Sequence, residues 1–274
     1  MAVVTISSEI GSGGPEIGTA LARAVGYRFL DREVIAEAAT RFGLHEKKLA
    51  GLDERKPSLF QLFDTETRRY MLGTQAALCE FAAADNVVLV GRGGQWLLRG
   101  IPHVLRVRVT APFELRVQRL AERQAPQKAR GAPPRAIVEM ARADDVGRSG
   151  RTRYLYGIDI DDVSLYDVLV NTATLSFEAA VDLLVTALRQ PELATTDAGR
   201  QLVADRILAA KVEVALATHP KARKLTITVE ASHGGVMLES TSELSDAVAV
   251  ARTVPGVQNV QTRRLESPST PPLA

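Results

Sequence analysis

A glycine-rich segment near the N-terminus carries residues that could bind phosphate. Gly11, Gly13 and Gly14 flank Ser12, after a short β-branched run at 3–6 and before a helical pattern. Glycine allows positive φ and close approach of the backbone to a ligand, and free N–H groups at a helix N-terminus attract anions. The spacing predicts that Gly11, Ser12, Gly13 and Gly14 form a phosphate-binding loop. A tight strand-to-helix turn without a ligand is the alternative.

Arginine side chains could supply the cations that a phosphate site needs. The sequence contains 27 Arg and 7 Lys, and the planar guanidinium suits bidentate contact with phosphate. Arg92 follows a buried strand predicted at 86–90, at the carboxyl end where ligands of α/β sheets bind. Further arginines gather in an Arg-, Gly- and Pro-rich segment at 125–157. Each arginine could instead be a solvated surface charge, so its position in the fold must decide.

Alternating strands and helices would position these residues. Short apolar runs predict strands at 3–6, 86–90, 104–109 and 166–172, and helical patterns separate them. Strands that alternate with helices indicate a parallel sheet covered by helices on both faces. The predicted fold class for most of the chain is therefore α/β.

The pattern changes near residue 190, where QPELATTDAGR is typical of a linker. A smaller α+β unit follows, with a helix, a β-hairpin, a second helix and a final strand, in the order αββαβ. The Pro- and Ser-rich end of the chain is predicted to be disordered. The predicted boundaries are 1–190 for the first domain, 191–200 for the linker, 201–266 for the second domain and 267–274 for the tail. We expect the fragment 1–195 to fold alone.

Composition and charge exclude several classes of protein. Hydrophobic residues make up 46% and charged residues 24% of the sequence, as in globular proteins. No run approaches the ~18 uncharged apolar residues of a membrane helix, and the lone Cys79 excludes a disulfide framework and a zinc fold. The net charge of +2 gives no basic surplus for nucleic acid. The N-terminus has no leader pattern, so we expect a cytoplasmic location.

Several blocks, in order, resemble the cytidylate kinase-like family of nucleoside monophosphate kinases. They are ISSEIGSGGPEIGTALARAVGYRFLDREVI, VVLVGRGG, VLRVRVTAPFELRVQRL, the spacing from Asp145 to Arg148, and LYDVLVNTATLSFEAA. The resemblance covers about residues 1–188. It implies a P-loop kinase fold with a mobile Arg-rich lid. It also implies transfer of the γ-phosphoryl group of ATP, with Mg²⁺, to a nucleoside monophosphate, with CMP or dCMP as the expected acceptor.

The resemblance and the needs of phosphoryl transfer give the site residues their expected roles. Asp31 and Arg32 fall where the family has nucleotide-site residues, although Asp31 could instead cap a helix that begins near Glu33. Arg92 would bind the acceptor phosphate, and lid arginines would bring charge onto the transferring group. The predicted acceptor-binding residues are Asp31, Arg32, Arg92 and Asp145, and the predicted catalytic residues are Arg148, Arg151 and Arg153.

The loop departs from the wider kinase pattern. Classical cytidylate kinases have a loop lysine, a hydroxyl for Mg²⁺ and an acidic residue before the GR pair, and these places hold Gly14, Glu16 and Val90 here. Ser12 is the nearest hydroxyl and therefore the predicted metal ligand, and Glu9 or Glu16 could contact the metal through water. Pro15 removes a backbone N–H. These departures leave a second class of function open, a nucleotide sensor with little turnover whose C-terminal unit signals to a partner.

The second unit resembles a BON domain. Its αββαβ order, its hairpin glycine and its closing residues Gly256, Val257 and Val260 carry the resemblance. BON domains are small binding modules associated with membranes or hydrophobic ligands, so a protein or a hydrophobic ligand is implied as a partner. A docking or dimerisation module without a ligand is the alternative, and a homo-oligomer is left open.

Overall fold

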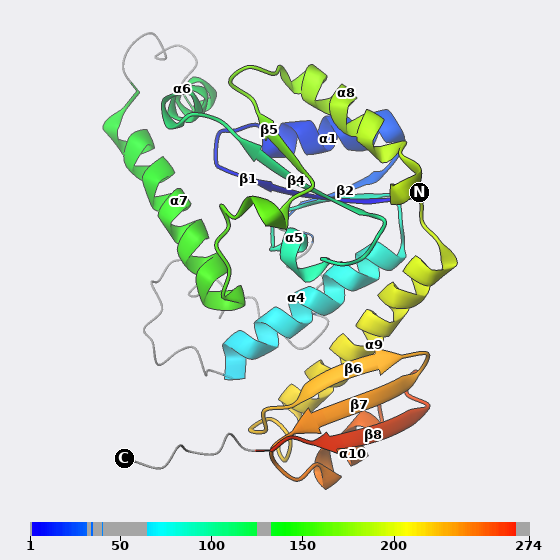
Figure 1. Ribbon diagram of the computed structural model, residues 1–274. Coiled ribbons are helices and arrows are strands. Elements are labelled where there is room, and N and C mark those ends of the chain that lie inside the picture. Colours follow the sequence, from blue (N-terminus) through cyan, green and yellow to red (C-terminus); the bar gives the residue numbers. More distant parts are fainter. Residues whose placement is uncertain (1, 32–33, 35–39, 41–64, 125–132, 267–274) are drawn as a thin grey trace, which may run out of the picture.

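Five parallel strands form the central sheet of the larger of two units (Figure 1). The computed structural model describes residues 2–31, 34, 40, 65–124 and 133–266. The strands are β1 (Val3–Ser8), β2 (Arg28–Leu30), β3 (Val87–Val90), β4 (Val104–Thr110) and β5 (Val168–Asn171), in the order β2-β3-β1-β4-β5. Every residue of β1 and β3 is buried, as expected for parallel strands that are covered on both faces.

Helices cover both faces of the sheet, which confirms the predicted α/β class. One face carries α1 (Gly14–Val25) and α8 (Phe177–Leu188), and the other carries α4 (Thr65–Ala83) and α5 (Gly94–Leu97) (Figure 1). Alternate residues of a strand point to opposite faces. Accordingly, Val4 of β1 packs in the core with α1 and α8, while Val3 packs in the core with α4 and α5.

The strand order fixes where a ligand can bind. β1 lies between β3 and β4, and the chain passes to the other side of β1 after β3. In open α/β sheets a crevice forms at the carboxyl ends of the strands where the order reverses in this way. The segment between β1 and α1, which contains the glycines, therefore lies at the crevice. Two helices, α6 (Phe113–Gln124) and α7 (Arg135–Tyr156), lie beside the same end (Figure 1).

The part of the predicted lid within 135–156 is one continuous helix, α7, which ends at Gly157 in the left-handed conformation. Residues 125–132 lie outside the described residues. Two short 3₁₀ turns complete the larger unit, η2 (Val163–Leu165) before β5 and η3 (Pro191–Leu193) after α8.

The C-terminal unit has the predicted αββαβ order. It consists of α9 (Asp197–Thr218), β6 (Thr228–Ser232), β7 (Gly235–Ser240), α10 (Ser245–Ala251) and β8 (Asn259–Arg264). β6 and β7 are antiparallel, whereas β7 and β8 are parallel. One face of this small mixed sheet packs on α9 and α10 around Leu238 and Val212. The predicted tail at 267–274 lies outside the described residues.

Helix α9 contacts both units. It begins inside the predicted linker, where Thr196 Oγ1 accepts a hydrogen bond of 3.0 Å from the Gly199 N–H and caps the helix. In the first half of α9, Val203 is fully buried in the core that contains α4. The second half of α9 belongs to the core of the small sheet. Arg69 Nε of α4 also donates to the Ala217 carbonyl at 3.0 Å. Neither α9 nor any other helix in the described ranges is long and apolar enough to cross a membrane.

This packing gives a direct test of the predicted boundary at 190–200. We expect the fragment 1–195 to be less stable than 1–210, because it lacks Val203, which is buried in the same hydrophobic core as Leu78 and Leu98. Burial of one aliphatic side chain contributes about 1.5–3 kcal/mol, so the free energy of unfolding should fall by about 2 kcal/mol or more. Urea unfolding measures both values. Cooperative unfolding with equal free energies would show that α9 adds nothing to the larger unit.

Candidate active site

A cleft of about 760 Å³ opens at the carboxyl ends of β1, β2 and β3. Its walls come from the segment between β1 and α1, from the turn after β3 and from α7. Among the residues with predicted roles, the cleft is lined by Gly11, Gly13, Asp31, Arg92, Arg148 and Arg151. The fold thus brings together residues that are up to 140 positions apart in the sequence, from Gly11 to Arg151. Ser12, Gly14, Asp145 and Arg153 do not line it.

The glycines of the loop are required by its conformation. Gly11 and Gly13 have φ values of +79° and +97°, a region that L side chains rarely adopt. A Cβ atom on Gly13 would lie 2.3 Å from the Phe177 ring, and one on Gly14 would lie 2.2 Å from Ser8 Oγ. Gly13 also caps α1, with no side-chain hydrogen bond at the cap. The loop therefore presents backbone at a helix N-terminus, as a phosphate site requires.

Ser12 stabilises the loop from within. Its side chain is fully buried, and its single O–H proton is shared between the Glu9 carbonyl at 2.7 Å and the Val109 carbonyl at 3.1 Å. The Ser12 carbonyl in turn accepts from Thr172 Oγ1 at 2.8 Å. A hydroxyl that is buried between two carbonyls does not fit the predicted role of a magnesium ligand. No group of three or more His, Cys, Asp or Glu side chains in the described ranges could hold a metal ion either.

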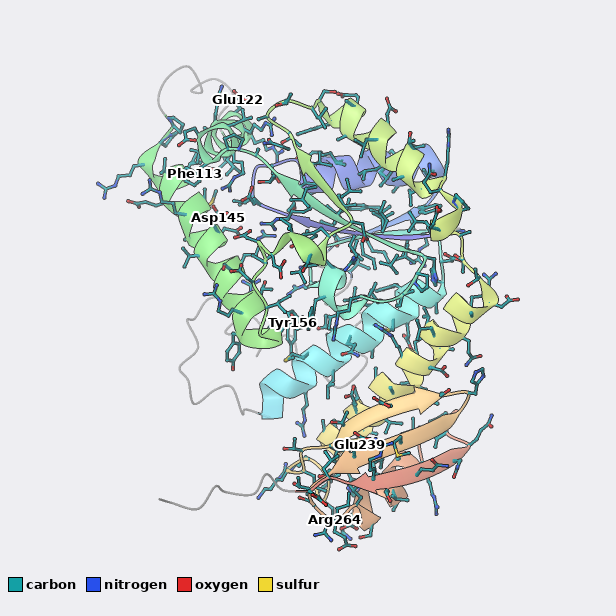
Figure 2. The ribbon with its side chains drawn as sticks, in the orientation of Figure 1. Phe113, Glu122, Asp145, Tyr156, Glu239 and Arg264 are labelled. Carbon is teal, nitrogen blue, oxygen red and sulfur yellow. The ribbon has the colours of Figure 1, made fainter. Side chains whose placement is uncertain are left out.

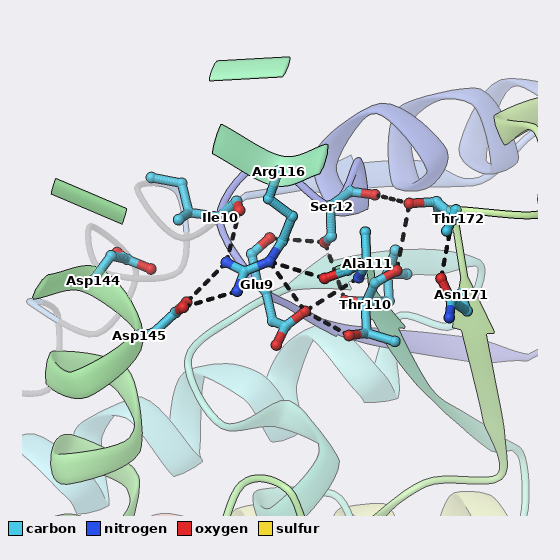
Figure 3. A network of polar contacts seen from close by, with 12 residues as sticks. Glu9, Ile10, Ser12, Thr110, Ala111, Arg116, Asp144, Asp145, Asn171 and Thr172 are labelled. Carbon is cyan, nitrogen blue, oxygen red and sulfur yellow. Dashed lines mark hydrogen bonds and ion pairs between the residues drawn. The ribbon is translucent and has the colours of Figure 1, made fainter. Parts of the chain in front are cut away.

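A buried arginine ties the loop to α7 (Figure 3). Arg116 of α6 donates from Nη1 to the Ile10 carbonyl at 3.2 Å and from Nε to the Ala111 carbonyl at 3.1 Å. Both terminal nitrogens also contact the Asp145 carboxylate, at 3.0 and 2.8 Å. Burial opposes the charge on Arg116, but Asp145 and Glu9 outweigh it and raise the guanidinium pKa above its usual value. The Asp145 carboxylate thus pairs with Arg116, whereas the sequence predicted that it binds the acceptor.

The lid arginines divide into two groups. Arg148 lines the cleft and pairs with Asp144 at 2.9 Å, and Arg151 lines the same wall. Arg153 instead pairs with Asp159 at 3.2 Å, and its side chain is 67% exposed. The structure therefore brings two of the three predicted catalytic arginines to the cleft.

Arg92 lies in a strained turn after β3. Its φ is +57°, between Gly91 at +85° and Gly93 at +74°. A large side chain seldom adopts positive φ, and such strain concentrates at functional sites. Arg92 Nη1 donates to the Tyr70 hydroxyl at 2.9 Å. Tyr156, at the α4 end of α7 (Figure 2), packs on Gly93, and burial raises its pKa above the usual tyrosine value.

Asp31 lies at the cleft and also caps a turn. Its Oδ1 accepts a hydrogen bond of 3.0 Å from the Val34 N–H, three residues along the chain, which is the contact expected of a capping residue. Glu33, where the capped helix is expected to begin, lies outside the described residues. Arg32, the neighbouring predicted acceptor residue, lies outside the described residues.

Sequence reasoning missed an ion pair at the cleft. Glu16, in the first turn of α1, pairs through Oε1 with Nη2 of Arg123 near the end of α6, and both residues line the cleft. Helical spacing gave a signal, because Arg116 and Arg123 are seven residues apart and two turns of a helix place them on one face. The sequence pattern could not show that this face of α6 contacts α1.

Comparison with known proteins agrees with this architecture. A model of the cytidylate kinase-like family matches residues 3–174, which is more than half of the chain. The chain belongs to this family.

Relatives of this cytidylate kinase-like chain include two archaeal proteins named cytidylate kinase. The protein of Staphylothermus marinus is 29% identical over 185 residues, covering 67% of this chain and 94% of the relative. The protein of Pyrobaculum arsenaticum is 31% identical over 188 residues, covering 68% and 91%. An uncharacterized protein from Eubacterium ventriosum has a similar solved structure, with a TM-score of 0.52, 14% identity and coverage of 69% of this chain and 98% of its own. That likeness shows the fold.

The family match ends at residue 174, before the C-terminal unit begins. The resemblance of that unit to a BON domain therefore receives no support from the match. The observed αββαβ order describes its architecture and assigns it no ligand.

Proposed function

We propose that the chain transfers the γ-phosphoryl group of ATP to a nucleoside monophosphate. One observation carries the proposal: a single cleft is lined by a glycine loop at a helix N-terminus, by Arg92 after β3, and by Arg148 and Arg151 of α7. Phosphoryl transfer depends on alignment and on cations around the phosphate oxygens, and this arrangement offers both. The names of the archaeal relatives support the same class of reaction. Because ATP and monophosphates are cytoplasmic, we place the protein there.

Different residues of the cleft would bind the phosphate donor and the phosphate acceptor. Backbone N–H groups of the loop would bind the donor phosphates, and the Arg92 guanidinium would bind the acceptor phosphate. An oxygen of the acceptor phosphate then attacks the γ-phosphorus, the bond to the bridging β,γ-oxygen breaks, and ADP leaves with the bond electrons. The attacking oxygen is already anionic, so no general base is needed. Arg148 and Arg151 would offset the charge on the transferred group.

Magnesium stays a prediction from the family resemblance. The buried Ser12 hydroxyl does not fit a metal ligand, and no other residue of the loop carries a hydroxyl or a lysine amine. Glu9 also lines the cleft, but its Oε2 already accepts hydrogen bonds from Thr110 Oγ1 at 2.5 Å and from the Ala111 N–H at 3.2 Å. No step of the proposed transfer therefore depends on a metal ion held by these side chains.

A coupled assay of ADP release tests the proposal. With ATP and Mg²⁺, we expect CMP or dCMP to stimulate ADP release more than AMP, GMP or UMP, because the sequence blocks are those of the cytidylate kinase-like family. Hydrolysis of ATP without an acceptor is the background to subtract. Equal stimulation by all five monophosphates would contradict the acceptor assignment, and no stimulation by any of them would contradict phosphoryl transfer.

A second candidate function is a nucleotide sensor with little turnover. Gly14 and Pro15 favour it, since they remove the loop cation and one N–H from the phosphate site. Helix α9 would then connect the kinase-like unit to a C-terminal binding module for a protein or a hydrophobic ligand, or to a second copy of the chain. Isothermal titration that shows ATP binding, together with absent turnover for every acceptor, would favour this candidate.

A further inference from the structure

The ion pair between Glu16 and Arg123 occupies the edge of the proposed donor site. Glu16 belongs to the first turn of α1, two residues after Gly14, and Arg123 reaches it from α6. The side chains are 36% and 47% exposed, respectively, and both line the cleft. The pair is therefore accessible to a ligand that enters the cleft.

The two residues of the pair have opposite effects on a phosphate ligand. The guanidinium of Arg123 can form two parallel hydrogen bonds with phosphate oxygens, as it can with a carboxylate. The Glu16 carboxylate repels phosphate charge at the helix end that otherwise attracts anions. A phosphate in the loop and the Glu16 carboxylate thus compete for the same guanidinium, and the two anions repel each other.

The second oxygen of Glu16 adds an independent observation. Glu16 Oε2 is buried and has no hydrogen-bond partner within the described part of the chain. A buried carboxylate oxygen without a donor is costly. The carboxylate is therefore poorly satisfied where it lies, which favours its release of Arg123 to a stronger anion.

We propose that Glu16 competes with the donor phosphates for Arg123 and thereby sets the affinity of the cleft for the phosphate donor. In the free protein Glu16 holds the guanidinium beside the loop. When a donor binds, Arg123 exchanges the carboxylate for phosphate oxygens, and the Glu16 charge remains as a penalty. This inference rests on the proposed function, because it assumes that the loop binds the donor phosphates.

Titration of the full chain with ATP tests the inference. We expect Glu16→Gln to tighten ATP binding about fivefold, the size of effect that a partly exposed charge pair supports. Inorganic tripolyphosphate should show the same ratio, whereas adenosine, which carries no phosphate, should bind both proteins equally. Glu139→Gln is the matched control, because Glu139 pairs with an arginine on the exposed face of α7 and does not line the cleft.

The double variant Glu16→Gln/Arg123→Gln checks that the gain passes through Arg123, since it should bind ATP more weakly than Glu16→Gln alone. Unchanged or weaker ATP binding by Glu16→Gln would overturn the inference and leave the proposed function standing. Absence of ATP binding by the unmodified chain, with binding restored by Glu16→Gln, would support the inference and count against efficient phosphoryl transfer. Absence of binding in both proteins would overturn both.

Discussion

Replacement of Arg148 by alanine should lower kcat about 10³-fold and leave KM for the monophosphate nearly unchanged, if Arg148 acts as an arginine finger does. The reason is its place on α7 in the wall of the same cleft as the glycine loop, where it would contact the transferred group mainly as charge develops there. A contact made only in the transition state affects kcat and spares KM. Steady-state kinetics with the best acceptor, at saturating ATP, measures both constants.

Two further variants of α7 make this result specific. Arg135→Ala is the matched control, because Arg135 pairs with Glu139 four residues away, as Arg148 does with Asp144, but is 91% exposed. It should retain unmodified constants. Arg153→Ala should resemble the control, since Arg153 pairs with Asp159 outside the cleft. If Arg153→Ala lowered kcat as much as Arg148→Ala, the division of the lid arginines into two groups would be wrong. If Arg148→Ala left kcat unchanged, Arg148 would not act in catalysis.

Replacement of Arg116 by methionine should lower the free energy of unfolding by about 3 kcal/mol, in the range measured when one partner of a buried ion pair is removed. Arg116 is 5% exposed and joins the loop at Ile10 to the Asp145 carboxylate of α7. Methionine fills most of the volume but leaves these groups without a donor. Urea unfolding measures the loss.

Arg106→Met provides the matched comparison. Arg106, on β4, also pairs with an aspartate, Asp167, at 3.0 Å from Nε, but the two side chains are 23% and 36% exposed. Water and salt can replace much of that pair, so the loss should be about 1 kcal/mol or less. Equal losses for the two variants would mean that the Arg116 network is no more costly to break than an ordinary surface pair.

Sequence patterns predicted much of the fold, because they depend on neighbours along the chain. The β-branched run before Gly11 and the apolar run before Arg92 are strands, as expected, and alternation with helices led correctly to a parallel sheet. The loop glycines were also predictable, since positive φ is a local property of the backbone. The αββαβ order of the C-terminal unit followed from the same kind of pattern.

The site was less predictable, because residues far away in the sequence decide which of its charged side chains form ion pairs. Arg148 and Arg153 look equivalent in sequence, yet five residues along a helix turn the side chain by about 140°, so a single helix through this segment separates them. Residues 135–156 form one continuous helix, which their Arg-, Gly- and Pro-rich composition did not indicate. Asp145 looked available for a ligand until α6 brought Arg116 against it.

The sequence by itself determined the loop conformation, the sheet and the family, all of which rest on local backbone preferences and on the order of elements. Only the tertiary structure decided which charged side chains are available to a ligand. Packing commits Ser12 to two carbonyls, Asp145 to Arg116 and Glu16 to Arg123. Coulombic and hydrogen-bond energies depend on separations of a few ångströms between groups that the sequence places up to about 100 residues apart, and those separations exist only once the elements have packed.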